Sequence, residues 1–199
     1  MSEIPPKMSP GLPNTPLKNA IVLTILLFFS MLTIGWVGAA QHPAIGEQLL
    51  SFFEKEVAGQ MMGDNSFELC GKILINNLET CILLFLGGAS FGIITILIMS
   101  LNGIVIGAIV QMVLKDHSPA FIAAALLPHG IFEIPGFILA GALGILFSQA
   151  LVSEYYGQGD AAGEAARLSR MFFTTVLPLI VVAAIVEAFI TPQVIQLVV

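Results

Sequence analysis

Residues 80–114 form a run of 35 residues without a single charged side chain. One helix that crosses a bilayer needs about 20 apolar residues, so this run must contain more than one membrane-spanning element. The rest of the chain has the same character, because 57% of its 199 residues are hydrophobic and only 10% are charged. Soluble domains carry roughly a quarter charged residues. We therefore expect an all-α, polytopic integral membrane protein.

Hydropathy predicts five membrane-spanning helices. They are expected at about residues 17–40, twice within residues 72–114, at residues 131–152 and at residues 171–190, the last kinked at Pro178. The break within residues 72–114 falls either at residues 87–88 or at residues 100–103. A cleaved signal peptide is the competing interpretation of the first span, since residues 38–40 resemble a small-residue cleavage site.

The apolar stretch at residues 121–127 is too short to cross a membrane. It ends at Pro128, which lacks a backbone donor and disfavours helix just before it. Such a segment is tolerated inside a membrane where protein or a wet cavity surrounds it. We expect a re-entrant or broken helix near residues 119–130. A full crossing here would give six spans instead of five and would place Arg167 and Arg170 outside the cell.

The polar segments divide the chain into an arm and one helical membrane domain. Residues 1–16 contain five prolines and are predicted to be a disordered arm, while residues 17–199 form the domain. Within it, residues 153–170 are expected to be a polar connection, and residues 41–71 a polar external segment. Part of the external segment is amphipathic, and this helix either lies on the membrane surface or packs on the protein's own spans; its apolar positions are Ile45, Leu49, Phe52, Phe53 and Val57.

The basic residues near the span ends predict the orientation. Lys7 and Lys18 precede the first span, and Arg167 and Arg170 precede the last. Basic residues are enriched on the cytoplasmic side, and five spans place both pairs there, with Lys115 as an exception. We expect a multi-pass protein of the cell membrane with its N-terminus in the cytoplasm and its C-terminus outside.

Ionisable side chains lie inside the predicted membrane segments. His129 and Glu133 lie between two prolines, four residues apart and so on one helix face. Each such group costs at least a few kcal/mol in hydrocarbon unless it is paired, hydrated or used. Four polar residues of other spans are the expected partners of this pair. In the predicted topology Asn76, Asn77 and Glu187 lie in the outer half of the membrane, and Asn102 lies in the inner half.

Several functions are compatible with this polar cluster. It can lock helices together by hydrogen bonds, or it can form a hydrated site for a small solute or an ion. His129, Glu133 and Glu187 could also ligate a divalent metal. Two features speak against this: the set contains only one histidine, and the HExxH pattern of zinc proteases is absent. No cofactor is otherwise predicted, and no catalytic residue, because no serine or cysteine has an identifiable base partner.

Small residues recur at four-residue spacing, which lets helices approach closely. Gly103 and Gly107 form one such stripe, and Gly136, Ala140 and Gly144 form another. They can pack within one chain or between two, and we expect a homo-oligomer, most simply a dimer. Membrane lipid and other membrane proteins are the remaining expected partners. No basic cluster suggests nucleic acid.

Residues 127–144, LPHGIFEIPGFILAGALG, resemble the signature of the stage II sporulation protein M family. Asn76-Asn77, residues 101–103 (LNG) and residues 183–192 (AAIVEAFITP) agree with it, so the resemblance covers about residues 70–192. It implies a polytopic all-helical membrane fold and supports the polar positions above without giving any of them a chemical role.

The best-known members of that family take part in engulfment during sporulation, in a complex that degrades peptidoglycan. Most members have no established activity, and nothing in this sequence indicates a sporulating source. We therefore expect a non-catalytic scaffold or complex subunit. The alternatives are a transporter or channel subunit with a solute or ion site at the polar cluster, and an intramembrane metalloenzyme.

Overall fold

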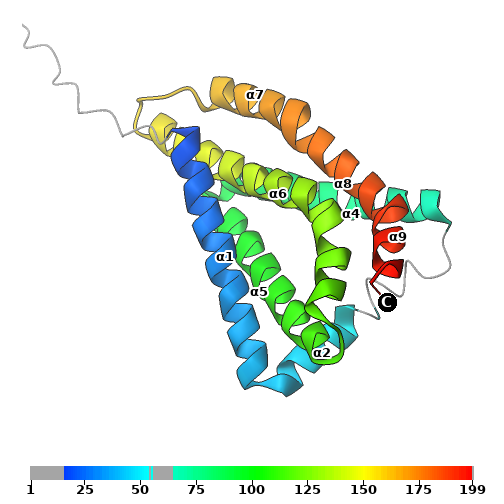
Figure 1. Ribbon diagram of the computed structural model, residues 1–199. Coiled ribbons are helices and arrows are strands. Elements are labelled where there is room, and N and C mark those ends of the chain that lie inside the picture. Colours follow the sequence, from blue (N-terminus) through cyan, green and yellow to red (C-terminus); the bar gives the residue numbers. More distant parts are fainter. Residues whose placement is uncertain (1–15, 54, 56–64, 199) are drawn as a thin grey trace, which may run out of the picture.

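The computed structural model describes residues 16–53, 55 and 65–198 (Figure 1). The predicted arm at residues 1–16 falls almost entirely outside this part of the chain, as does Val57. Every regular element among the described residues is helical. Five of these elements are long and apolar enough to cross a membrane, which confirms the predicted fold class and the count of five spans.

Short connections join the last four of the five long elements, and a short helix lies between the first and the second. They are α1 (Leu17–Gln41), α4 (Ser66–Leu86), α5 (Ile93–Asp116), α6 (Pro119–Tyr155), and α7 (Ala161–Met171) continued by a π-helical turn (Phe172–Val176) into α8 (Leu177–Phe189). Two short helices, α2 (Pro43–Phe53) and α9 (Thr191–Gln196), complete the described part. The core lies where the spans meet, around the fully buried Phe28, Leu84, Met99, Leu143 and Ile180.

The break between the second and third spans lies at the first of the two expected places. A 3-10 turn (Gly87–Ser90) ends α4. Phe91 and Gly92 then adopt left-handed backbone conformations, with φ of 54° and 84°. A left-handed residue cannot continue a right-handed helix, so the chain reverses here and residues 100–103 stay inside α5.

The glycine stripes pack within one chain. A Cβ atom added at Gly107 would collide with the carbonyl oxygen of Leu32, and one at Gly35 would collide with that of Ile104, so α1 and α5 lie in backbone contact. Gly144 of the second stripe packs in the same way against the carbonyl oxygen of Leu84. These contacts remove the argument from which we expected a homo-oligomer, and the oligomer stays a prediction without that support.

Residues 119–130 form the first part of a bent helix and not a separate re-entrant segment. They are the first part of α6, which runs through Pro128 and Pro135 for 37 residues. Its start is fixed by Ser118, whose hydroxyl accepts a hydrogen bond from the Phe121 amide at 3.2 Å. Figure 1 shows α6 turning sharply between a lower part beside α5 and an upper part that crosses it. Since proline cannot donate to the helix ladder, the two prolines are the physical cause of such a bend.

The predicted polar connection at residues 153–170 is wrong for most of its length. Only residues 156–160 connect α6 to α7, and Asp160 caps α7 by accepting a hydrogen bond from the Gly163 amide at 2.9 Å. The charged residues occupy one face of a helix: Arg167 is exposed, while Leu168 is fully buried. A π-helical turn precedes Pro178, the expected site of a kink, and the short helix α9 follows the last span.

The predicted amphipathic helix is α2, and it packs on the protein's own spans, while contact with the membrane surface stays a prediction. Its residues Leu49 and Leu50 pack on Ala39, Ala108 and Met112 at the ends of α1 and α5. Its other face is open, because Ile45 and Phe52 are exposed. Glu47 lies 3.9 Å from the Lys115 ammonium group at the end of α5, so the one basic residue that departs from the charge pattern has an acidic neighbour.

Candidate functional site

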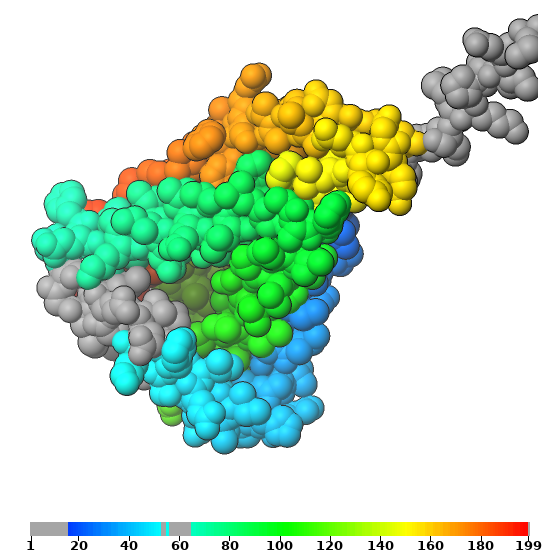
Figure 2. Space-filling view, turned by 180° about the vertical axis from the view of Figure 1, so that it is seen from behind, coloured from blue at the N-terminus to red at the C-terminus, as the bar shows by residue number. Residues whose placement is uncertain are grey.

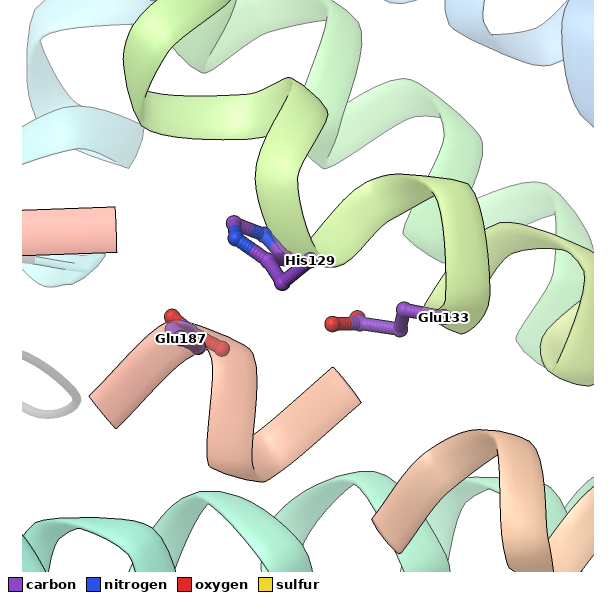
Figure 3. A group of neighbouring side chains, drawn as sticks. All are labelled: His129, Glu133 and Glu187. Atoms are coloured by element: carbon purple, nitrogen blue, oxygen red, sulfur yellow. The ribbon is translucent and has the colours of Figure 1, made fainter. Parts of the chain in front are cut away.

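Three of the predicted site residues converge at one point. His129, Glu133 and Glu187 each offer one ligand atom, and these atoms all lie within 4.8 Å of one another. Figure 3 shows the three side chains facing a common centre, His129 and Glu133 from α6 and Glu187 from α8. All three are half-buried. We refer to them as the His–Glu–Glu group.

The local sequence explains how these side chains are aimed. His129 and Glu133 are one helical turn apart on α6, on the segment that Pro128 and Pro135 bracket, so they share a face. Glu187 lies in the last turn of α8, which ends at Phe189. The group therefore lies where one helix is bent and the next one ends.

Thr191, the first residue of α9, completes the surroundings of the imidazole. Its hydroxyl oxygen lies 3.5 Å from Nδ1 of His129, and the hydroxyl donates to the carbonyl of Val186 at 3.3 Å. The side chain is buried. Sequence reasoning did not select Thr191, because it lies beyond the end of α8 and belongs to the next helix.

Two asparagines of α4 extend the group on the other side. The side chain of Asn77 lies near the Glu133 carboxylate. Asn76 is exposed and donates a hydrogen bond to the side-chain oxygen of Asn77 at 3.4 Å. This bond occupies the Asn77 oxygen, so the amide nitrogen of Asn77 is the group left to interact with the carboxylate. The sequence-predicted residues Asn76 and Asn77 thus reach the His–Glu–Glu group, the first only through the second.

Asn102 has a different environment from the other predicted residues. It lies on α5, and its side chain donates to the carbonyl of Ile98 on the same helix at 2.9 Å. Such a bond satisfies a polar side chain within its own helix. The described contacts of the His–Glu–Glu group come from α4, α6, α8 and α9, so the structure brings together five of the six predicted residues and assigns Asn102 a bond elsewhere.

The two carboxylates of the group repel each other, and this repulsion favours a bound cation. Glu133 and Glu187 bring carboxylate oxygens to within 4.8 Å of each other. At an effective dielectric constant of about 20, two unit charges at that separation repel by roughly 3 kcal/mol. A proton or a metal ion between them removes this repulsion.

The geometry also fits a metal ion after a modest adjustment. Oxygen and imidazole nitrogen ligands lie about 2.0–2.2 Å from zinc, so two ligands of a tetrahedral ion are about 3.4 Å apart. The observed limit of 4.8 Å needs a contraction of at most about 1.4 Å to reach this. One imidazole and two carboxylates suit zinc, iron or manganese, and three protein ligands leave a coordination position open for a water or a substrate.

The outside of the molecule has a recess on the side opposite to that of Figure 1. Figure 2 shows α4 across this face and α2 below it, with α6 visible deep between them and α5. Because α6 carries His129 and Glu133, this recess lies over the helix that supplies two members of the group.

Comparison with known proteins places the chain in a family. The family model for stage II sporulation protein M matches residues 24–192. An uncharacterized protein of Methanocaldococcus jannaschii is 24% identical over 181 residues, which cover 89% of this chain and 97% of that protein. A second uncharacterized protein of the same organism is 27% identical over 147 residues, covering 70% of this chain and 65% of that protein. No solved structure matches this chain. With most of its length matched by the family model, this chain is a member of the stage II sporulation protein M family.

Proposed function

We propose that this protein is a multi-pass membrane subunit that binds a divalent metal ion at the His–Glu–Glu group and takes part in moving that ion across the membrane. The observation that carries the proposal is the convergence of one imidazole and two carboxylates within 4.8 Å on membrane-spanning helices. Ionisable residues inside a membrane mark ion or substrate pathways.

The bend in α6 and the end of α8 support a transport function over a purely structural one. The group lies on the proline-bracketed part of α6 and at the end of α8. Secondary transporters bind their ions where helices are broken and free backbone groups and side chains meet, and a helix end and a helix with two internal prolines provide similar free backbone groups. The described chain has no phosphate-binding loop of the GxxxxGK[ST] type, so transport would be driven by an ion gradient or by a partner protein.

A scaffold without an ion site is the second candidate. Its support is the dense packing of α1 on α5 through Gly35 and Gly107, which gives a rigid platform within one chain. In that case the His–Glu–Glu group would hold α6 to α8 by hydrogen bonds. The two candidates differ in one measurable respect, because a scaffold of this kind does not need the negative charge of Glu133 or Glu187.

We further propose that the protein lies in the cell membrane with its N-terminus in the cytoplasm. This orientation is supported by Lys18 at the start of α1 and by Arg167 and Arg170 on α7, since basic residues favour the cytoplasmic side. The C-terminal α9, which carries Thr191, is then near the outer side.

Ion flux into proteoliposomes tests the proposal. Wild-type protein should carry Zn²⁺ or Mn²⁺ into vesicles that contain a metal-sensitive dye, whereas Glu133→Gln should not. Glu79→Gln is the matched control, because Glu79 is an exposed glutamate of the neighbouring α4. Equal flux with wild type and Glu133→Gln, or with protein-free vesicles and wild type, would contradict a transport function.

A further inference from the structure

The function of the His–Glu–Glu group depends on which nitrogen of His129 carries the proton. A neutral imidazole has one N–H donor and one lone pair, and the hydrogen bond of one nitrogen decides the state of the other. If Nε2 carries the proton, it can donate to a carboxylate and lock the helices together. If Nδ1 carries it, the lone pair of Nε2 is free to bind a cation.

The hydrogen bonds of Thr191 decide between the two tautomers. Its hydroxyl donates to the carbonyl oxygen of Val186 at 3.3 Å. That oxygen also accepts the Ile190 amide at 2.8 Å, and a carbonyl oxygen has two lone pairs, so both bonds are accommodated. A hydroxyl has one hydrogen, and that of Thr191 is therefore used. Toward Nδ1 of His129, 3.5 Å away, the threonine oxygen can only accept.

We infer that Thr191 is a positioning residue that holds His129 in the tautomer with the proton on Nδ1, so that Nε2 is the metal ligand. The inference rests on the proposed function and deepens it. The side chain of Asn77 already lies near the Glu133 carboxylate. The three groups that converge are then acceptors only: two carboxylates and the Nε2 lone pair. Ionised acceptors that meet without a donor between them require a proton or a metal ion.

The ligand set that results also selects the class of ion. An imidazole nitrogen with carboxylates suits Zn²⁺, Fe²⁺ or Mn²⁺, whereas Mg²⁺ and Ca²⁺ prefer oxygen ligands throughout. A hydrogen bond from the non-ligating nitrogen orients the ring and makes the ligating nitrogen more basic. Thr191 supplies the acceptor for that bond, in the place where many metal sites use a carboxylate or a backbone carbonyl.

Nitrogen NMR and metal titration of two substitutions test this inference. The chain has three histidines, so the imidazole signals of ¹⁵N-histidine-labelled protein can be assigned with His42→Gln and His117→Gln. In the metal-free wild type, His129 should show the proton on Nδ1. Thr191→Val keeps the shape and removes the hydroxyl; it should lose this preference and bind Zn²⁺ about 10- to 100-fold more weakly. Thr191→Ser keeps the hydroxyl and should restore both.

The outcomes separate this inference from the proposed function. Zn²⁺ binding by the wild type with equal affinity in Thr191→Val would overturn the inference and leave the metal site standing. Failure of the wild type to bind Zn²⁺ or Mn²⁺ would overturn the proposed function, and the tautomer of metal-free His129 would still test the place of Thr191. A proton on Nε2 in the wild type contradicts the inference in either case, even if Thr191→Val does not fold.

Discussion

Glu133 of α6 and Glu187 of α8 bring their carboxylate oxygens to within 4.8 Å of each other beside the imidazole of His129. The two residues are 54 positions apart in the sequence, and each helix would be more easily accommodated in lipid without its carboxylate. The pair makes physical sense when a cation lies between the two oxygens. This relationship gives the proposals their most direct tests.

Replacing Glu133 by glutamine should leave the fold intact and abolish metal binding. Glutamine has nearly the same shape and can still hydrogen-bond to Asn77, and it removes the repulsion between two carboxylates. The melting temperature of the metal-free variant in detergent should differ from that of the wild type by less than about 4 °C, the shift that 1 kcal/mol produces in a domain of this size. The stabilisation of the wild type by added Zn²⁺ should be missing. A Zn²⁺-dependent rise equal to that of the wild type would show that the charge of Glu133 is not needed.

Replacing Asn77 by alanine should weaken Zn²⁺ binding, because the Glu133 carboxylate then loses the polar side chain that lies near it. Loss of an outer hydrogen bond to a metal ligand reduces affinity by about 10- to 100-fold. Asn102→Ala is the control, since Asn102 bonds to the carbonyl of Ile98 in its own helix. Calorimetric titration should show the loss with Asn77→Ala alone. A similar loss with Asn102→Ala would mean that α5 belongs to the site.

Replacing Gly107 by alanine should destabilise the protein, because the added Cβ atom meets the Leu32 carbonyl oxygen at the contact between α1 and α5. Overpacking of this kind costs about 1–3 kcal/mol. Gly38→Ala provides the comparison, since a Cβ atom at Gly38 has no neighbour within 4 Å. Thermal unfolding in detergent should show a lower midpoint for the first variant and not for the second. Equal midpoints would contradict the close contact of the two helices.

Cysteine labelling should establish the orientation. In a background with Cys70→Ser and Cys81→Ala, a cysteine at the exposed position Ser51 on α2 should react with a membrane-impermeant thiol reagent in whole cells. A cysteine at the exposed position Ala162 on α7 should react only after the cells are opened. The reverse pattern would invert the proposed orientation, and labelling of both positions in intact cells would favour six crossings.

Sequence reasoning predicted the spans well because membrane helices follow from hydropathy alone. It could not place the break between α4 and α5, since glycines occur at residues 87–88 and at residue 103, and only the backbone shows that the left-handed conformations fall at Phe91 and Gly92. It treated residues 119–130 as separate because Pro128 usually ends a helix in water. It missed α7 because residues 161–171 contain charges that read as a loop until one face is found to be buried.

The candidate site was predictable to a different degree for each residue. The spacing of His129 and Glu133 places them on one helix face. The predicted order of the spans places Glu187 in the same half of the membrane. Thr191 could not be selected in that way, because a hydroxyl near a helix end usually serves as a cap or a stop signal. Its role follows only from the positions of His129 and Val186 around it.

Metal stoichiometry of the purified protein tests the central claim most directly. The metal-free protein should be titrated with Zn²⁺ and Mn²⁺, washed, and measured by elemental mass spectrometry. The account predicts one bound ion per 21.1 kDa chain for the wild type and for Glu79→Gln, and none for the double variant Glu133→Gln, Glu187→Gln. Bound metal in the double variant at the level of the wild type, or no bound metal in the wild type, would contradict it.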